Sequence, residues 1–310
     1  METASVVCPA CHGRLSVDDE GAAVCDVCHA RYAAEAGRPV LLVPGDQRFD
    51  DALDCCLLAD EERTNAFTTT SYHLPLLRRL LGPDFAGRAV LSAGCGVGVD
   101  VDLYREAGLD AHGVDCGSRV EAWPRRRHPG AFEIGSVTHL PYPDNAFDAV
   151  ITGCLLPHIG VVGDSAELRP EGEAERRLVA AELLRVTKPG GHLIMGNPNR
   201  LCPADLFHKG QMAGPGSLIR WHGPSEPFLL SFADYEALFG GAATIETLPP
   251  SNYWGFHTKE ERPHTRLLAR ALKAYFALLS LPALGWLRRS PANPWLMVLA
   301  TKPRQRGTPA

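Results

Sequence analysis

Four cysteines near the N-terminus have the types and spacing of a metal site. They form two Cys-x-x-Cys pairs separated by thirteen residues. Four thiolates in this pattern can bind zinc tetrahedrally, with Zn–S bonds of about 2.3 Å. Such a set leaves no open coordination position, so the zinc is expected to be structural. The predicted ligands are Cys8, Cys11, Cys25 and Cys28.

A glycine-rich turn further along the chain has the features of a cofactor site. An apolar segment runs into Gly-x-Gly-x-Gly at 94–98. Glycine permits both the tight turn and the close approach of a ligand to the main chain. Seventeen residues beyond Gly98, Asp115 ends a second apolar segment. A carboxylate there can accept hydrogen bonds from both hydroxyls of a ribose. The order of strand, turn, helix, strand and acid therefore predicts a nucleotide-type cofactor.

The glycine spacing distinguishes two cofactor classes. A dinucleotide site has Gly-x-Gly-x-x-Gly, which this turn lacks. The turn instead resembles motif I of class I S-adenosylmethionine (SAM)-dependent methyltransferases. The resemblance continues in order through residues 134–136, 140–150 and the Lys-Pro-Gly-Gly segment at 182–191. It covers residues 88–200 and indicates the family, though not a substrate.

This resemblance implies a set of SAM-binding residues. The glycines pass under the methionine and ribose parts, Asp115 holds the ribose, and residues after the later strands flank the adenine and methionine. Ser92 and Ser136 replace acids that usually approach the methionine and adenine amino groups; a hydroxyl at Ser136 can still serve, so SAM binding is expected. The implied set is Gly94, Cys95, Gly96, Gly98, Asp115, Cys116, Ser136, Val137, Thr152 and Gly153.

Methyl transfer requires an aligned acceptor and, for a hydroxyl or neutral amine, a group that accepts a proton. His158 follows the fourth predicted strand and titrates near neutral pH, so it is a candidate general base. A structural histidine is an equal alternative. Asn197, Asn199 and His222 are candidate substrate-orienting residues, with ordinary turn residues as the competing interpretation.

The first 45 residues have a family resemblance of their own. The cysteine knuckles, Tyr32 and the segment 37–42 resemble a small zinc-ribbon subunit that activates several methyltransferases acting on tRNA, rRNA and release factors. A fused copy could brace the catalytic domain. The segment also resembles the zinc finger of bacterial 23S rRNA guanine methyltransferases, which suggests RNA docking as an alternative.

Alternating strands and helices are expected to position these residues. Strands alternating with helices form a parallel sheet covered on both faces, and its buried strands are continuously apolar. The predicted fold is α/β, a Rossmann-like seven-stranded methyltransferase sheet with helices on both faces, plus a small N-terminal zinc ribbon. The expected strands are 88–94, 109–115, 132–137, 147–154, 192–197, 243–249 and 294–303, and the expected helices include 74–81, 98–108, 174–188 and 232–242, with a Pro-Gly-Gly turn at 189–191.

Three parts are predicted along the chain: a ribbon at 1–45, a helical cap or linker at 46–87, and a methyltransferase domain at 88–303 with a helical insertion at about 255–292. The insertion contains an apolar, basic segment at 264–289. Its uncharged stretch is too short to span a bilayer, and Pro282 is expected to break the helix. A lid over the substrate pocket is favoured, and peripheral membrane contact is the alternative.

The composition is that of an ordinary globular protein. The chain has 310 residues, of which 45% are hydrophobic and 22% charged, and a net charge of −5. The acidic balance argues against a dedicated nucleic-acid binder. The N-terminus has no secretory pattern, so we expect a cytoplasmic protein whose paired cysteines bind metal rather than form disulfides.

These features predict a methyltransferase that acts on an O or N atom of a small molecule, in specialised metabolism. The alternatives are an rRNA or tRNA methyltransferase that docks through the ribbon, a quinone or lipid methyltransferase, and a SAM-fold protein without activity. The sequence leaves the acceptor atom and the oligomeric state open.

Overall fold

The computed structural model describes residues 6–48, 55–163, 165–205, 208, 220–253 and 266–304. The chain divides into two compact units. Unit 1 comprises residues 1–151, 181–192 and 304–310, and unit 2 comprises residues 152–180 and 193–303. Three elements have residues in both units: β9 (Phe147–Gly153), α4 (Gly172–Val186) and β10 (Thr187–Pro198).

Buried apolar strands form the sheet of unit 1. β6 (Ala89–Ala93) pairs in parallel with β7 (Asp110–Asp115) on one side and with β9 on the other. β8 (Phe132–Gly135) pairs in parallel with β7. Val90 and Leu91 are fully buried, as expected for strands covered on both faces. The predicted α/β fold with a largely parallel sheet is confirmed.

The N-terminal segment forms a small sheet of its own. β1 (Leu15–Val17), β2 (Ala23–Cys25) and β3 (Arg31–Tyr32) are antiparallel, in that order. A short hairpin follows, made of β4 (Ala34–Glu35) and β5 (Arg38–Leu41).

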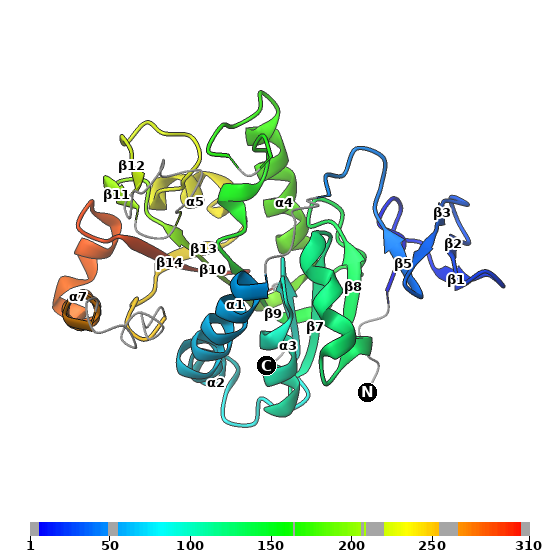
Figure 1. Ribbon diagram of the computed structural model, residues 1–310, viewed down its shortest axis with the longest axis horizontal. Coiled ribbons are helices and arrows are strands. Elements are labelled where there is room, and N and C mark those ends of the chain that lie inside the picture. The colour runs from blue at the N-terminus through cyan, green and yellow to red at the C-terminus, as the bar shows by residue number, and fades with distance from the viewer. Residues whose placement is uncertain are drawn as a thin grey trace. The chain divides into compact units, whose positions relative to one another are not determined.

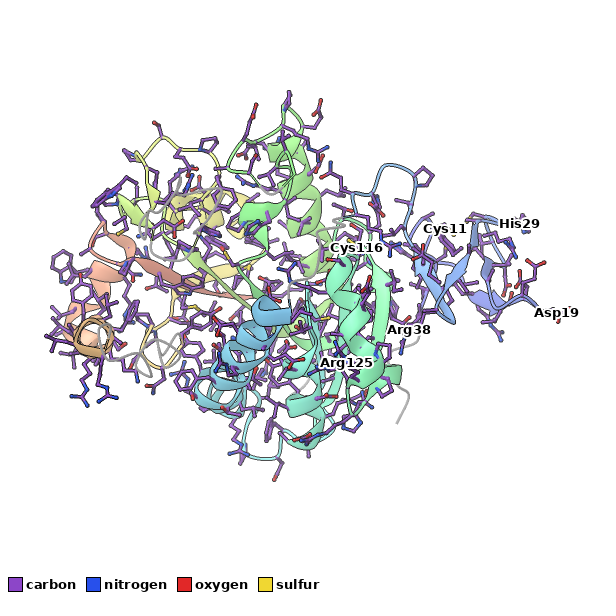
Figure 2. All side chains as sticks on the ribbon, viewed as in Figure 1. Cys11, Asp19, His29, Arg38, Cys116 and Arg125 are labelled. Carbon is purple, nitrogen blue, oxygen red and sulfur yellow. The ribbon has the colours of Figure 1, made fainter. Side chains whose placement is uncertain are left out.

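The last strand of this segment also joins the larger sheet. β5 pairs in parallel with β8, with Val40 opposite Ile134 (Figure 1). Arg38 strengthens the junction, because its guanidinium donates to the carbonyl oxygens of Phe132 at 2.9 Å and Pro129 at 2.5 Å (Figure 2). The predicted ribbon is therefore continuous with the sheet that carries the glycine turn.

Helices of unit 1 follow the expected pattern. α2 (Leu74–Leu81) ends at Gly82, whose φ of 92° takes the chain out of the helix. Before it come α1 (Cys55–Thr68) and the π-helical η1 (Thr69–His73). α3 (Val99–Glu106) follows the glycine turn, and two 3₁₀ helices, η2 (Ser118–Arg125) and η3 (Pro129–Ala131), follow β7.

One predicted turn in unit 1 is wrong. The Pro-Gly-Gly segment at 189–191 lies inside β10, which begins at Thr187. A Cβ on Gly191 would lie 2.9 Å from the carbonyl oxygen of Asp148 in β9. Glycine therefore allows the main chain of this segment to come close to β9, and the segment stays in the strand.

Unit 2 contains the remaining strands. β13 (Thr244–Thr247) is antiparallel to β14 (Trp295–Thr301), which neighbours β10. α5 (Phe232–Phe239) begins with a capping box in which Ser231 and Asp234 satisfy each other's main-chain amides. A separate two-stranded sheet joins β11 (Ala204–Asp205) to β12 (Arg220–Trp221).

The predicted insertion lies in unit 2. Its described part contains α7 (Arg266–Leu279) and the 3₁₀ helix η6 (Pro282–Arg289), so the helix ends before Pro282 as expected. Large apolar side chains remain exposed on it, including Leu267 and Trp286. Within the described ranges, none of the helices combines the length and apolar character needed to cross a membrane.

Candidate functional site

The glycine turn joins β6 to α3 in a conformation that requires glycine. Gly94, Gly96 and Gly98 have φ values of 71°, 52° and 74°, in the left-handed region. A Cβ on Gly98 would also come within 2.4 Å of the Phe132 ring. The turn is anchored to the next strand, because the amides of Gly94 and Cys95 donate to the carbonyl oxygen of Val114.

Asp115 connects the end of β7 to this turn. One carboxylate oxygen accepts the amide of Gly96 at 2.8 Å, and the other accepts the amides of Cys116 at 2.7 Å and Gly117 at 2.9 Å. The half-buried carboxylate is therefore held in place by main-chain donors. Each carboxylate oxygen can accept about two hydrogen bonds, so the oxygen that binds Gly96 keeps capacity for a hydroxyl group of a ligand.

A second acid of this region was missed by the sequence analysis. The Ser92 hydroxyl, in β6, donates to Oδ2 of Asp100 in the first turn of α3, at 2.5 Å. Asp100 is buried, and its Oδ1 has no hydrogen-bond partner among the described residues. Burial raises the pKa of Asp100 to about 6. The serine that replaces the usual acid is therefore paired with an acid eight residues later.

A similar replacement occurs at the third strand. Ser136 contacts the hydroxyl of Thr138 at 2.5 Å, and Thr138 donates to Oδ1 of Asp46 at 2.6 Å. The same oxygen lies 2.8 Å from Nδ1 of His139. Asp46 comes from the segment after β5, ninety-two residues before Thr138. An acid is thus present beside Ser136, although it comes from a distant part of the chain.

Other residues of unit 1 surround the turn. The Cys116 thiol (labelled in Figure 2) donates to the carbonyl oxygen of Gln47 at 3.3 Å. The segment after β5 therefore also reaches the residues that are predicted to flank the adenine. Arg119, whose Cδ is the nearest neighbour of a Cβ built on Gly96, forms a two-point ion pair with Glu61 of α1. Val137 is buried next to Ser136. α1 is therefore tied to the glycine turn.

The four N-terminal cysteines come together as predicted. Sγ of Cys8 lies 3.7 Å from that of Cys28, and Sγ of Cys11 lies 3.4 Å from that of Cys25. Main-chain amides of Cys28 and Val27 face the Cys25 sulfur and lower the pKa of its thiol to about 6. These donors favour a thiolate, the form that binds metal. The cluster is compatible with tetrahedral zinc.

The remaining implied SAM residues belong to unit 2. Thr152 is buried and Gly153 is exposed at the end of β9. Asn197 and Asn199 are buried too, and their amides bind loop carbonyls: Asn197 Nδ2 donates to Leu230 at 3.0 Å and Asn199 Nδ2 to Asn293 at 2.9 Å. These contacts favour a structural role, while contact with substrate stays a prediction.

Two predicted histidines also lie in unit 2. His222 follows β12, and its Nδ1 is 3.3 Å from the carbonyl oxygen of Gly223. His158 ends the 3₁₀ helix η4 (Leu156–His158), and its Nε2 lies 3.3 Å from Nε2 of His208. The sequence analysis did not single out His208. His158 is thus part of a cluster and is not an isolated side chain.

Cys154 completes this cluster. Its Sγ is 3.6 Å from Nε2 of His208, and Asp205 Oδ2 lies 2.7 Å from Nδ1 of the same ring. Burial lowers the pKa of His208, but the interactions with Cys154 and Asp205 outweigh it and raise the pKa to about 10.

Comparisons with known proteins agree with the geometry of unit 1. Residues 91–195 match the model of a methyltransferase domain family. A demethylmenaquinone methyltransferase from Renibacterium salmoninarum is 37% identical over 110 residues, which cover 35% of this chain and 40% of that protein. A probable S-adenosylmethionine-dependent methyltransferase from Mycolicibacterium smegmatis is 32% identical over 131 residues, covering 40% and 46% respectively.

A solved complex between the Haloferax volcanii Trm112 methyltransferase activator and a methyltransferase contains a chain that is 15% identical, with a TM-score of 0.48, covering 82% of this chain and 97% of that one. This chain spans less than half the length of the two curated relatives named above. The predicted resemblance is confirmed over its central part, where residues 91–195 match the methyltransferase domain family.

Proposed function

We propose that this chain is an enzyme that transfers a methyl group from SAM to an O or N atom of a small molecule. The observation that carries the proposal is the Asp115 carboxylate, which accepts the Gly96 amide and so joins the ribose-binding acid to the glycine turn. The methyltransferase domain match at 91–195 and the names of the relatives support it.

The described residues fit the charge pattern of SAM. The buried Oδ1 of Asp100 lacks a partner among them, and the ammonium of the methionine part would supply one. Ser136, together with Asp46, offers acceptors for the adenine amino group. The two acids thus take the places of the acids that Ser92 and Ser136 replace.

When bound, SAM supplies a methyl group on a positively charged sulfur, which is an electrophile. Asp115 and Asp100 would orient the cofactor at its ribose and methionine ends. His158 is the candidate proton acceptor. Its Nε2 lies 3.3 Å from that of His208, whose raised pKa keeps that ring protonated near neutral pH, so His158 alone would accept the proton.

The ribbon would support the cofactor site indirectly. Zinc bound by the four cysteines would hold β1–β3 together and thereby fix β5 and Asp46. Since Asp46 contacts Thr138 and His139, the metal would support the cofactor site from a distance. RNA docking through the ribbon remains the alternative, and binding to RNA that falls steeply with salt would favour it.

A second candidate concerns the acceptor. Relatives include the demethylmenaquinone methyltransferase and a fatty-acid O-methyltransferase from Mycolicibacterium smegmatis, 28% identical over 142 residues, which cover 44% of this chain and 45% of that protein. Leu267 and Trp286 are exposed on the insertion beside basic residues. An apolar acceptor in or near a membrane would suit this surface. Co-sedimentation with anionic vesicles, lost in a Leu267→Glu/Trp286→Glu variant, would support it.

The deciding experiment is calorimetric titration of the full chain with S-adenosylhomocysteine. We expect micromolar binding, weakened about 10- to 100-fold by Asp115→Asn, because hydrogen bonds to a charged acceptor contribute about 1.5–3 kcal/mol each. Asp19→Asn, an exposed aspartate of the ribbon (Figure 2), is the matched control. A folded wild-type chain that does not bind the ligand would overturn the proposal.

A further inference from the structure

Three side chains of unit 2 converge from separate parts of the sequence. Cys154 follows β9, His158 ends η4, and His208 lies beyond β11. Sγ of Cys154 and Nε2 of His158 lie 3.6 Å and 3.3 Å from Nε2 of His208. The three donor atoms all lie within 4.8 Å of one another. A thiol and two imidazoles are among the preferred zinc donors in proteins.

The spacing of these donors matches one tetrahedral ion. With Zn–S bonds of about 2.3 Å and Zn–N bonds of about 2.0–2.1 Å, tetrahedral geometry places two nitrogens about 3.3 Å apart and a sulfur and a nitrogen about 3.5 Å apart. The observed separations are 3.3 Å and 3.6 Å. The ribbon cysteines, at 3.4 Å and 3.7 Å, show the same convergence.

A buried carboxylate orients one of the imidazoles. Asp205 is buried, and its two oxygens lie 2.7 Å from Nδ1 and 3.2 Å from the main-chain nitrogen of His208. A carboxylate only accepts, so Nδ1 carries the proton. When a metal displaces the proton on Nε2, the lone pair of that nitrogen points toward Cys154 and His158. Metal-binding histidines commonly have such a carboxylate behind them.

The backbone at the cysteine is unusual as well. Cys154 has a φ of 48°, although residues with a side chain rarely adopt this region. Its amide donates to the carbonyl oxygen of Gly196 at 2.8 Å, which holds the strained turn in place. Strained residues of this kind concentrate at functional sites, because surrounding contacts must maintain them.

We propose that Cys154, His158 and His208 bind a zinc ion and that Asp205 positions His208. Among the residues that the structure describes, the candidate metal ligands of this cluster are these three. Three protein ligands are typical of zinc sites in which a fourth position takes water or an oxygen atom of a substrate. The expected exogenous ligand is therefore a small oxygen donor. The proposal does not require methyl transfer, and a zinc-bound His158 would not also serve as the proton acceptor of that reaction.

Zinc content of the full chain tests the proposal. After loading with Zn²⁺ and removal of excess by gel filtration, elemental analysis should find two zinc ions per wild-type chain. Cys154→Ser, His158→Ala and His208→Ala should each contain one. Cys202→Ser and His222→Ala are matched controls from the same unit, outside the cluster, and should keep two. Cys25→Ser should lose only the ribbon zinc.

A measurement on the wild type guards against variants that fail to fold. Zinc X-ray absorption of the loaded chain should show histidine nitrogen and fewer than four sulfur neighbours per zinc on average. Four sulfurs per zinc and a single ion per chain would overturn the proposal, as would folded His208→Ala protein that retains two ions. A cluster that is held by hydrogen bonds alone would give the first of these results, one zinc ion per chain with four sulfur neighbours.

Asp205→Asn tests the positioning role separately. The amide can no longer fix the tautomer of His208 as the carboxylate does, so zinc affinity at this site should fall about 10- to 100-fold while the capacity at saturating Zn²⁺ stays at two. Unchanged affinity in a folded variant would remove Asp205 from the site.

Discussion

The candidate site of unit 1 is formed mainly by main-chain groups, whereas that of unit 2 is formed by side chains. In unit 1, main-chain groups do most of the positioning: the glycine turn donates to Val114 and Asp115, and the acids occupy fixed places around it. In unit 2, the candidate site consists of the side chains of Cys154, His158 and His208, held by one buried carboxylate.

This difference predicts how each site responds to change. A turn held by main-chain hydrogen bonds should tolerate exchange of nearby side chains and lose only the interaction that each acid makes with the ligand. A cluster of three side-chain donors should lose its metal when any donor is removed. Variants of one unit should also leave the ligand of the other in place, and the predictions below test that independence.

The largest effect is expected for Cys25→Ser. Apparent zinc-binding free energies of small structural sites are about 10–16 kcal/mol, and this free energy stabilises the fold that the metal holds. We expect loss of the ribbon zinc and at least a 10-fold weaker affinity for S-adenosylhomocysteine, because Asp46 and Gln47 follow the ribbon. Calorimetry and elemental analysis measure both. Unaltered ligand affinity in the zinc-deficient chain would show that the ribbon does not support the cofactor site.

Asp100→Asn should have the next largest effect. Removing the charge that would pair with the ammonium of the ligand should weaken S-adenosylhomocysteine about 10-fold at pH 7.5, while the unit 2 zinc content stays the same. Asp144→Asn, an exposed acid of unit 1, is the control. An equal effect of both variants would point to general electrostatics rather than to a contact.

The raised pKa of Asp100 also predicts a pH dependence. The pKa of Asp100 is about 6 in the folded protein and 3.8 ordinarily, because burial disfavours the charged carboxylate. The folded state is therefore most stable, with respect to this group, below about pH 4, where the carboxyl is protonated. That stability is lost as the pH rises through 6. The difference corresponds to about 3 kcal/mol. Urea unfolding at several pH values should show this slope in the wild type and a smaller one in Asp100→Asn.

Ligand binding should respond in the opposite direction. The ionised carboxylate pairs with the ammonium, so affinity for S-adenosylhomocysteine should rise as the pH increases from 5 to about 7 and then level off. In Asp100→Asn this rise should be absent. A rise of the same size in both proteins would assign the titration to another group.

Arg38→Ala should have the smallest effect. It removes two hydrogen bonds from the β5–β8 junction, each contributing about 0.5–1.5 kcal/mol. The free energy of unfolding should fall by about 1–3 kcal/mol, measured by urea denaturation, without a change in zinc content. Arg14→Ala, whose side chain is exposed in the ribbon, is the control and should be neutral.

Contiguous patterns explain why most of unit 1 could be predicted from the sequence. The glycine turn, Asp115 and the cysteine pairs lie in short segments whose order and spacing have a physical meaning. The strands around them are buried and largely apolar. These features need no knowledge of distant contacts.

The rest depends on tertiary structure. Asp46 reaches Thr138 across ninety-two residues, and His208 reaches Cys154 across fifty-four. No periodicity or spacing links such residues. Asp100 is closer in sequence to Ser92, but its pairing depends on the exact start of α3. A serine in place of an expected acid was the one hint that a substitute might lie elsewhere.

The parallel pairing of β5 with β8 has a consequence for the behaviour of shortened chains. An unpaired strand at the edge of a sheet presents a row of free amide and carbonyl groups that can pair with another molecule. A chain beginning after residue 48 would expose such a row along β8, beside the buried residues Phe132 and Ile134. The N-terminal segment therefore protects this edge against self-association, and its removal should favour aggregation even where the rest of the sheet still folds.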